Sequence, residues 1–127
     1  MKNLRPENGS PESTEKWGWK YHHLGIPTDK VMPEEIYLPQ FGLFVSGFSS
    51  SPFGVEWMRF EENSPIDRLI QTVPHLAFEV VDLDYELSAH DLKVITEPNS
   101  PSEGIIVAMI EHNGAPIELI EIKEILQ

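Results

Sequence analysis

Two histidines and two glutamates occupy matching places in two segments of this chain. The first segment runs from His23 to Glu56, and the second runs from His75 to Glu118. Imidazole nitrogens and carboxylate oxygens are common ligands of divalent transition metals. A fold that relates the two segments by pseudo-twofold symmetry would bring the four side chains together. We therefore treat His23, Glu56, His75 and Glu118 as candidate metal ligands.

The two segments are similar beyond these four residues. Each begins with a β-prone stretch around its histidine, Tyr21–Ile26 in the first copy and Val73–Phe78 in the second. Each ends with a stretch around its glutamate, Gly54–Met58 and Ala115–Leu119. The first copy is shorter, and the prolines within residues 27–40 argue against a long helix there. We expect this stretch to replace much of the first helix.

Strand geometry places the candidate ligands together. Because side chains alternate across a strand, both histidines lie opposite Leu24 and Leu76. We expect the leucine face to pack beneath a helix and the histidines to lie on an exposed concave face. Each glutamate shares its face with apolar residues, where an unpartnered charge is costly and a divalent cation would be a suitable partner.

The alternative for any one of these residues is a structural or solvent-facing role, which is more common for a single His or Glu in a strand. Their recurrence at matching positions favours the ligand interpretation. The other histidines have no such support. We expect His22 to be a packing or surface residue, His90 to lie at a helix end, and His112 to lie in a turn.

Hydrophobic periodicity predicts short strands and two helices. Strands are expected over residues 19–26, 41–48, 53–60, 74–81, 93–96, 105–111 and 115–122. One helix should follow Asp82 as far as His90, and a shorter one should follow Ser64 in the linker. The Asn113-Gly114 pair is the strongest hairpin signal. The second half therefore reads β-α-β-β-β.

The length of 127 residues suits one domain with a single core. Residues 1–16 are polar and are expected to form a disordered tail, leaving one domain over 17–127. Within it, the first module should span about 19–62, the linker 63–72 and the second module about 73–125.

Composition excludes several classes of partner and chemistry. The formal net charge is −12, and the few Lys and Arg residues are scattered, which argues against nucleic acid as a partner. No apolar run is long enough to predict a membrane helix, so no membrane partner is expected. The chain has no cysteine, which excludes disulfides and thiolate catalysis and suits a cytoplasmic location.

Three stretches of the chain resemble the vicinal oxygen chelate superfamily, which includes glyoxalase I and methylmalonyl-CoA epimerase. They are His23–Ile26, Pro74–Asp84 and Ala115–Glu121. The resemblance covers about residues 19–125. It implies an α+β fold of two βαβββ modules that form a curved mixed sheet around a cleft, as in glyoxalases, bleomycin resistance proteins and extradiol dioxygenases. Here the first module would be shortened.

The resemblance also implies a metal centre and a reaction. The family's ligand positions fall on His23, Glu56, His75 and Glu118, a set similar to that of bacterial-type glyoxalase I. The ion could be Ni, Co, Zn, Mn or Fe. We expect a metal-dependent lyase or isomerase that acts by proton transfer next to a carbonyl of a small oxygenated substrate, with the metal as Lewis acid. Glu118 is the first candidate for the catalytic base, with Glu56 as its symmetry mate.

Two alternatives remain open at this point. An extradiol-type iron dioxygenase would use only His23, His75 and Glu118, so Glu56 discriminates between the two enzymes. A metal-free binding protein of the bleomycin-resistance type would need none of the four. In either case the partner is a small molecule, and a homodimer is compatible with the resemblance. Glutathione and coenzyme A are not expected as substrate carriers, because both are anionic and no basic cluster faces the cleft.

Overall fold

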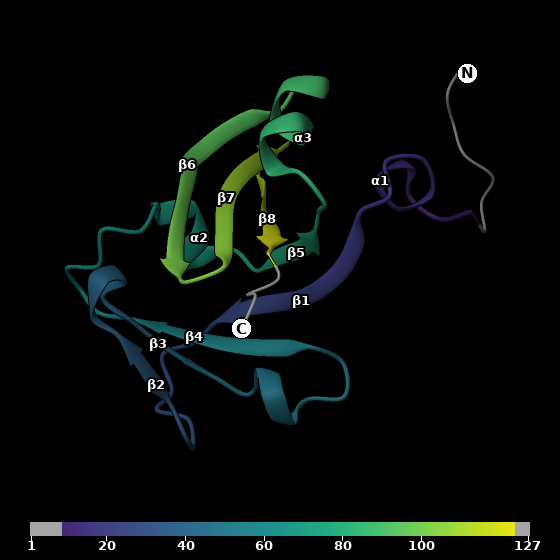
Figure 1. The fold of residues 1–127 in the computed structure, drawn as a ribbon. Helices are drawn as coiled ribbons and strands as arrows, with labels where there is room; N and C mark the ends of the chain where they lie inside the picture. The colour runs from purple at the N-terminus through teal and green to yellow at the C-terminus, as the bar shows by residue number, and fades with distance from the viewer. Residues whose placement is uncertain (1–8, 124–127) are drawn as a thin grey trace.

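The chain forms one curved sheet of eight strands with few helices, as Figure 1 shows for the computed structural model, which describes residues 9–123. The first half contributes β1 (Lys20–Pro27), β2 (Ile36–Leu38), β3 (Leu43–Ser46) and β4 (Val55–Phe60). The second half contributes β5 (His75–Glu79), β6 (Lys93–Ser102), β7 (Ile105–His112) and β8 (Ala115–Ile122). The strands lie side by side in the order β2-β3-β4-β1-β5-β8-β7-β6.

The strand order has the symmetry that the sequence repeat predicts. β1 and β5 meet as antiparallel neighbours at the centre of the sheet. Each is parallel to the last strand of its own module, β1 to β4 and β5 to β8. The registers match as well, because Gly25 lies opposite Glu56 and Ala77 lies opposite Glu118. The predicted fold class, two modules forming a curved mixed sheet, is confirmed.

The helices are short and unevenly shared between the modules. The longest, α3 (Leu83–Ala89), follows β5, and α2 (Arg68–Thr72) lies in the linker. Two 3-10 turns, η1 (Pro39–Phe41) and η2 (Phe48–Ser50), flank β3. Residues 28–35, all of which the structure describes, contain no helix between β1 and β2. The expected loss of the first helix is confirmed.

The outer face of the second module packs against α3. Here we call the face that carries Glu118 the inner face and the opposite one the outer face. The outer-face cluster consists of Trp19, Val80, Leu83, Ala108, Ile110 and Leu119, all buried. The prediction that Leu76 also packs beneath a helix is wrong, because its side chain is 43% exposed. Residues 28–35, between β1 and β2, contain no helix that could cover this part of the sheet.

The N-terminal segment is tied to this cluster. Residues 1–8 lie outside the described residues, whereas α1 (Glu12–Glu15) is a short helix within the stretch expected to be disordered. Trp19 is 3% exposed, and its Nε1 donates a hydrogen bond of 2.8 Å to Glu86. Trp17 stacks on His90 with 3.7 Å between ring centroids. These contacts explain why the chain is ordered ahead of β1.

Most predicted elements are present, although several differ at their ends and the short strand β2 was not predicted. Asp67 rather than Ser64 caps α2, by accepting a hydrogen bond of 2.9 Å from the Leu69 amide. Asp82 caps α3 as predicted. The strand expected to end at Thr96 continues as β6 to Ser102 through two prolines. It can do so because β6 lies at the edge of the sheet, where a missing amide hydrogen breaks few ladder bonds.

The Asn113-Gly114 hairpin is confirmed. Both residues have positive φ, 49° and 87°, as expected for a tight two-residue hairpin turn. It joins β7 to β8 and pairs His112 with Ala115. The hairpin thereby sets the register that places Met109 opposite Glu118 on the inner face. No helix within residues 9–123 has the length and apolar character needed to cross a membrane.

Candidate metal centre

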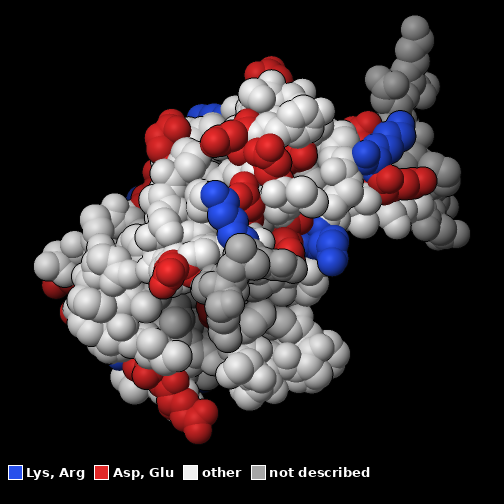
Figure 2. All heavy atoms as spheres, viewed as in Figure 1, with Lys and Arg blue, Asp and Glu red and all other residues white. Residues whose placement is uncertain are grey.

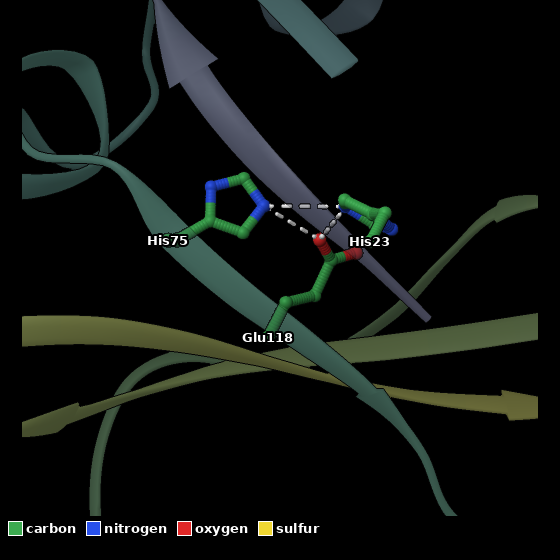
Figure 3. A group of neighbouring side chains, drawn as sticks. All are labelled: His23, His75 and Glu118. Carbon is green, nitrogen blue, oxygen red and sulfur yellow. Dashed lines mark hydrogen bonds and ion pairs between the residues drawn. The ribbon is translucent and has the colours of Figure 1, made fainter. Parts of the chain in front are cut away.

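Three of the four candidate ligands converge on the inner face of the sheet. His23 Nε2, His75 Nε2 and Glu118 Oε1 point toward one another from β1, β5 and β8 (Figure 3). The two histidine nitrogens are 3.4 Å apart. Glu118 Oε1 lies 3.3 Å from His23 Nε2 and 3.1 Å from His75 Nε2. The three donor atoms therefore form a small triangle.

The register of the three central strands produces this triangle. His23 pairs with Ala77, and Ala77 pairs in turn with Glu118, so the three side chains share one face. His75 joins them opposite Gly25. A Cβ atom at position 25 would collide with Cε1 of the His75 ring and would lie 2.6 Å from its Nδ1. Glycine is therefore required at position 25 by the packing of the ring.

The triangle has the size that a divalent metal needs. Metal–ligand distances of about 2.1 Å with bond angles near 90° place neighbouring donor atoms about 3.0 Å apart, and tetrahedral angles place them about 3.4 Å apart. The observed separations of 3.1 to 3.4 Å fall within this range. Two imidazoles and a carboxylate are also a donor set that such ions prefer. The residues present fit a divalent transition metal.

Burial leaves one ring nitrogen of His75 without a partner within residues 9–123. His75 is 1% exposed, and among the described residues its Nδ1 has no hydrogen-bond partner. Burying a polar ring with one nitrogen unsatisfied costs free energy. A metal bound at Nε2 would not pair Nδ1, so the case for a metal rests on the triangle of donor atoms. The expectation that both histidines lie on an exposed face is wrong, because His23 is also only 5% exposed.

The metal-free cluster is electrostatically polarised. Burial acts to raise the pKa of Glu118, but hydrogen bonds from His23 and His75 outweigh it and lower that pKa to about 2. Burial acts to lower the pKa of His23, and the hydrogen bond and charge of Glu118 outweigh that effect, so the His23 pKa is raised. The two shifts together favour the ion pair of protonated His23 and ionised Glu118 over the neutral pair.

Glu56, the fourth candidate, lies beside this group rather than in it. Its Oε1 is 3.9 Å from His23 Nε2. The group of donor atoms that lie within 4.8 Å of one another contains only the other three residues, within the part of the chain that the structure describes. Burial raises the pKa of Glu56, and the nearby charge of Glu118 adds to the shift. The pseudo-symmetry of the backbone is thus not kept by the side chains.

His22 is a site residue that the sequence analysis missed. A bulge between Tyr21 and His23 adds one residue to β1, so His22 and His23 both line the inner cavity. Their Nδ1 atoms are 2.7 Å apart, which means that one ring donates a hydrogen bond to the other. His22 also stacks on Phe48 at 5.1 Å with an interplanar angle of 10°. Strict strand alternation cannot reveal a bulge, but the adjacent pair His22-His23 is a signal that could have been followed.

The hydrogen bond between His22 and His23 is of the kind that orients a metal-binding histidine. A histidine that binds metal through Nε2 carries its proton on Nδ1 and usually donates it to a neighbouring acceptor. Burial and the adjacent His23 lower the pKa of His22, which favours the neutral ring that can accept. His22 therefore holds the His23 ring with Nε2 directed at Glu118.

His23, His75 and Glu118 lie in the wall of a cavity of about 280 Å³. The rest of its lining is mainly aliphatic, aromatic and methionine side chains of the inner face, including Leu43, Met58, Phe60, Met109 and Ile120. Its ionisable lining groups are Glu56, Glu118 and the three histidines, and no Lys or Arg of the described residues takes part. The cavity thus combines a compact polar site with apolar walls.

Comparison with known proteins identifies the fold. No protein-family model matches the sequence, and no curated protein matches it. A hypothetical protein from Bacillus halodurans C-125 aligns with a TM-score of 0.65 and 21% identity, covering 86% of this chain and 98% of that chain. Methylmalonyl-CoA epimerase from Mycobacterium tuberculosis aligns with a TM-score of 0.59 and 20% identity, covering 83% of this chain and 89% of that chain.

The chain shares its fold, a curved mixed sheet built from two repeated modules, with these two proteins. At this level of identity the likeness establishes the arrangement of strands, and the reaction must be argued from the site itself. The site offers a three-donor cluster that can hold a metal ion, a second carboxylate beside it and an apolar cavity above it.

Proposed function

We propose that this protein is a metal-dependent isomerase or lyase that moves a proton next to a carbonyl group of a small oxygenated substrate. The observation that carries the proposal is the cluster of His23, His75 and Glu118 in the wall of a cavity that Glu56 also lines. The likeness to methylmalonyl-CoA epimerase supports an isomerase-type reaction. The cytoplasmic location, the homodimer and the limits of the domain at 17–127 stay predictions from the sequence.

The three clustered residues would hold the ion. A divalent cation bound there would supply Lewis acidity to substrate oxygens and so make the neighbouring C–H bond more acidic. The identity of the ion stays open among Ni, Co, Zn, Mn and Fe, since a donor set of two imidazoles and a carboxylate accepts all of them.

Geometry favours Glu56 over Glu118 as the group that moves the proton. Glu118 lies within 3.3 Å of both histidine Nε2 atoms, and releasing it would break the cluster. Glu56 lies at the edge of the cluster and lines the cavity, with 3.9 Å to its nearest histidine nitrogen. It can therefore approach a substrate carbon without leaving the metal ligands incomplete. The resemblance seen in the sequence instead places Glu118 first and Glu56 second as candidates for the catalytic base.

The test is proton exchange on a screened substrate. Metal-loaded protein is incubated in D2O with small α-hydroxycarbonyl and dicarbonyl compounds, and deuterium uptake at the carbon next to the carbonyl is followed by NMR. Glu56→Gln should keep its metal and lose exchange by about 100-fold or more, the usual range for a general base. Glu118→Gln should lose metal. Exchange at the parent rate in Glu56→Gln would contradict the assignment of the base.

A second candidate function rests on the same three residues. Two histidines and one carboxylate with open positions are also the ligand set of iron(II) oxygenases. The position of Glu56 outside the donor cluster favours this alternative more than the sequence did. Loading with Fe(II) under anaerobic conditions, followed by oxygen uptake with catechols, separates the two. Ring cleavage in step with oxygen uptake would replace the isomerase proposal.

A further inference from the structure

We propose that the substrate has an uncharged apolar body and is not attached to an anionic carrier. The proposal rests on the function proposed above and adds the chemical class of the compound that enters the cavity. It is argued from the cavity wall, from the positions of the basic residues and from the size of the cavity.

The cavity wall is apolar in both modules. Met58 and Phe60 follow Glu56 on the inner face of β4, and Ile120 and Ile122 follow Glu118 on the inner face of β8. Each carboxylate is thus continued along its strand by two large apolar side chains. Burial of apolar groups is the main favourable contribution that such a wall can make to binding. A substrate held at the metal-binding cluster would extend its body along these side chains.

No Lys or Arg of the described residues lines the cavity, and the arginines Arg59 and Arg68 lie elsewhere. Arg59 lies on the outer face, where it donates two hydrogen bonds of 2.8 Å to Glu35 and lies 4.1 Å from the centre of the Phe44 ring. Arg68 lines a separate depression together with Glu61 and Glu62. The face in Figure 2 likewise shows acidic side chains with only a few basic ones between them. Inside the cavity, an anionic group would meet Glu56 and Glu118 and no basic side chain of the described residues.

The volume of the cavity also favours a compact ligand. A volume of about 280 Å³ lies just below the range of about 300–1,000 Å³ typical of small-molecule sites. The apolar walls take up much of the inner surface, so the polar part of the ligand is confined to the cluster of His23, His75 and Glu118. The ligand chemistry that fits is a compact carbonyl compound with an aliphatic or aromatic substituent.

The test uses alkyl hydroxamates, which bind a metal through two adjacent oxygens and vary only in their tails. Binding to Co(II)-loaded protein is followed by the visible absorption of the ion. Because each buried methylene strengthens binding by about fourfold, hexanohydroxamate should bind at least about tenfold more tightly than acetohydroxamate. Succinate monohydroxamate, which carries an anionic tail, should bind no better than acetohydroxamate.

A charge placed at the cavity mouth provides the matched comparison. Ile122 lines the cavity and is 46% exposed, so Ile122→Lys should fold, favour the anionic probe and weaken hexanohydroxamate binding. Val81→Lys, at a position 92% exposed and outside this cavity, should leave both affinities unchanged. Binding that is independent of tail length, or preference of the parent protein for the anionic probe, would overturn the substrate class alone. Failure to bind Co(II) would overturn the proposed function and this inference together.

Discussion

Replacing Gly25 with alanine tests how the sheet positions the metal-binding cluster. The added Cβ would lie 2.6 Å from His75 Nδ1 and 2.8 Å from its Nε2, whereas ordinary contacts are about 3.5–4.0 Å. The ring would have to move by roughly 1 Å, far more than the ±0.2 Å that metal–ligand bonds tolerate. We expect a loss of metal affinity of about 100-fold, the upper end of the range for residues that orient ligands. Overpacking of the buried ring should also destabilise the metal-free fold by about 1–3 kcal/mol.

The assay is calorimetric titration of chelated protein with Co(II), paired with urea unfolding of the metal-free form. Ala77→Gly is the matched control, because position 77 is the pseudo-symmetric equivalent of Gly25 and loses a Cβ instead of gaining one. It should cost about 1 kcal/mol of stability and keep most of the metal affinity. If Gly25→Ala bound Co(II) as tightly as the parent, the His75 ring would not be held by close packing against residue 25, and the reasoning would be wrong.

Three further outcomes are expected. His22→Phe keeps an aromatic ring but removes the hydrogen-bond partner of His23 Nδ1, so metal affinity should fall about 10-fold to 100-fold, and the melting temperature of the chelated protein should also fall. His22→Asn should restore part of the affinity. Metal that binds only the native state should raise the melting temperature of the parent and of His112→Ala, but not of His75→Ala, as scanning calorimetry would show. Without metal, the Glu118 pKa is depressed, so its contribution to stability is present above about pH 4.5 and is lost as the pH falls toward about 2. The His23 pKa is raised, so its contribution to stability is complete below about pH 6.5 and is lost as the pH rises through the raised value. Urea unfolding of the chelated protein from pH 3 to 8 should therefore show that the stabilising contribution of this pair is greatest between about pH 4.5 and 6.5. Glu118→Gln should remove that contribution.

The sequence predicts the backbone of this protein well, because backbone symmetry follows from strand periodicity. The repeat of His23 and His75, with a glutamate at the end of each copy, anticipates the matching registers of Gly25 with Glu56 and of Ala77 with Glu118. The missing first helix is also predictable, since prolines interrupt the segment where it would form.

The side-chain arrangement could not be predicted in the same way. A single bulge in β1 turns His22 into the cavity, and bulges depend on how two strands fit together rather than on one strand's pattern. The asymmetry between Glu118 and Glu56 is likewise a property of side-chain conformation within a symmetric backbone. Leu76 is exposed because the helix that would cover it is absent, which its own apolar character does not reveal.

The measurement that tests the central claim most directly is the metal content of the protein and its ligand variants after dialysis against Ni(II) or Co(II) and removal of unbound ion. The parent should retain one ion per chain. His23→Ala, His75→Ala and Glu118→Ala should each lose it, whereas Glu56→Gln should retain it. Retention of metal by the three ligand variants, or its absence from the parent, would contradict the account.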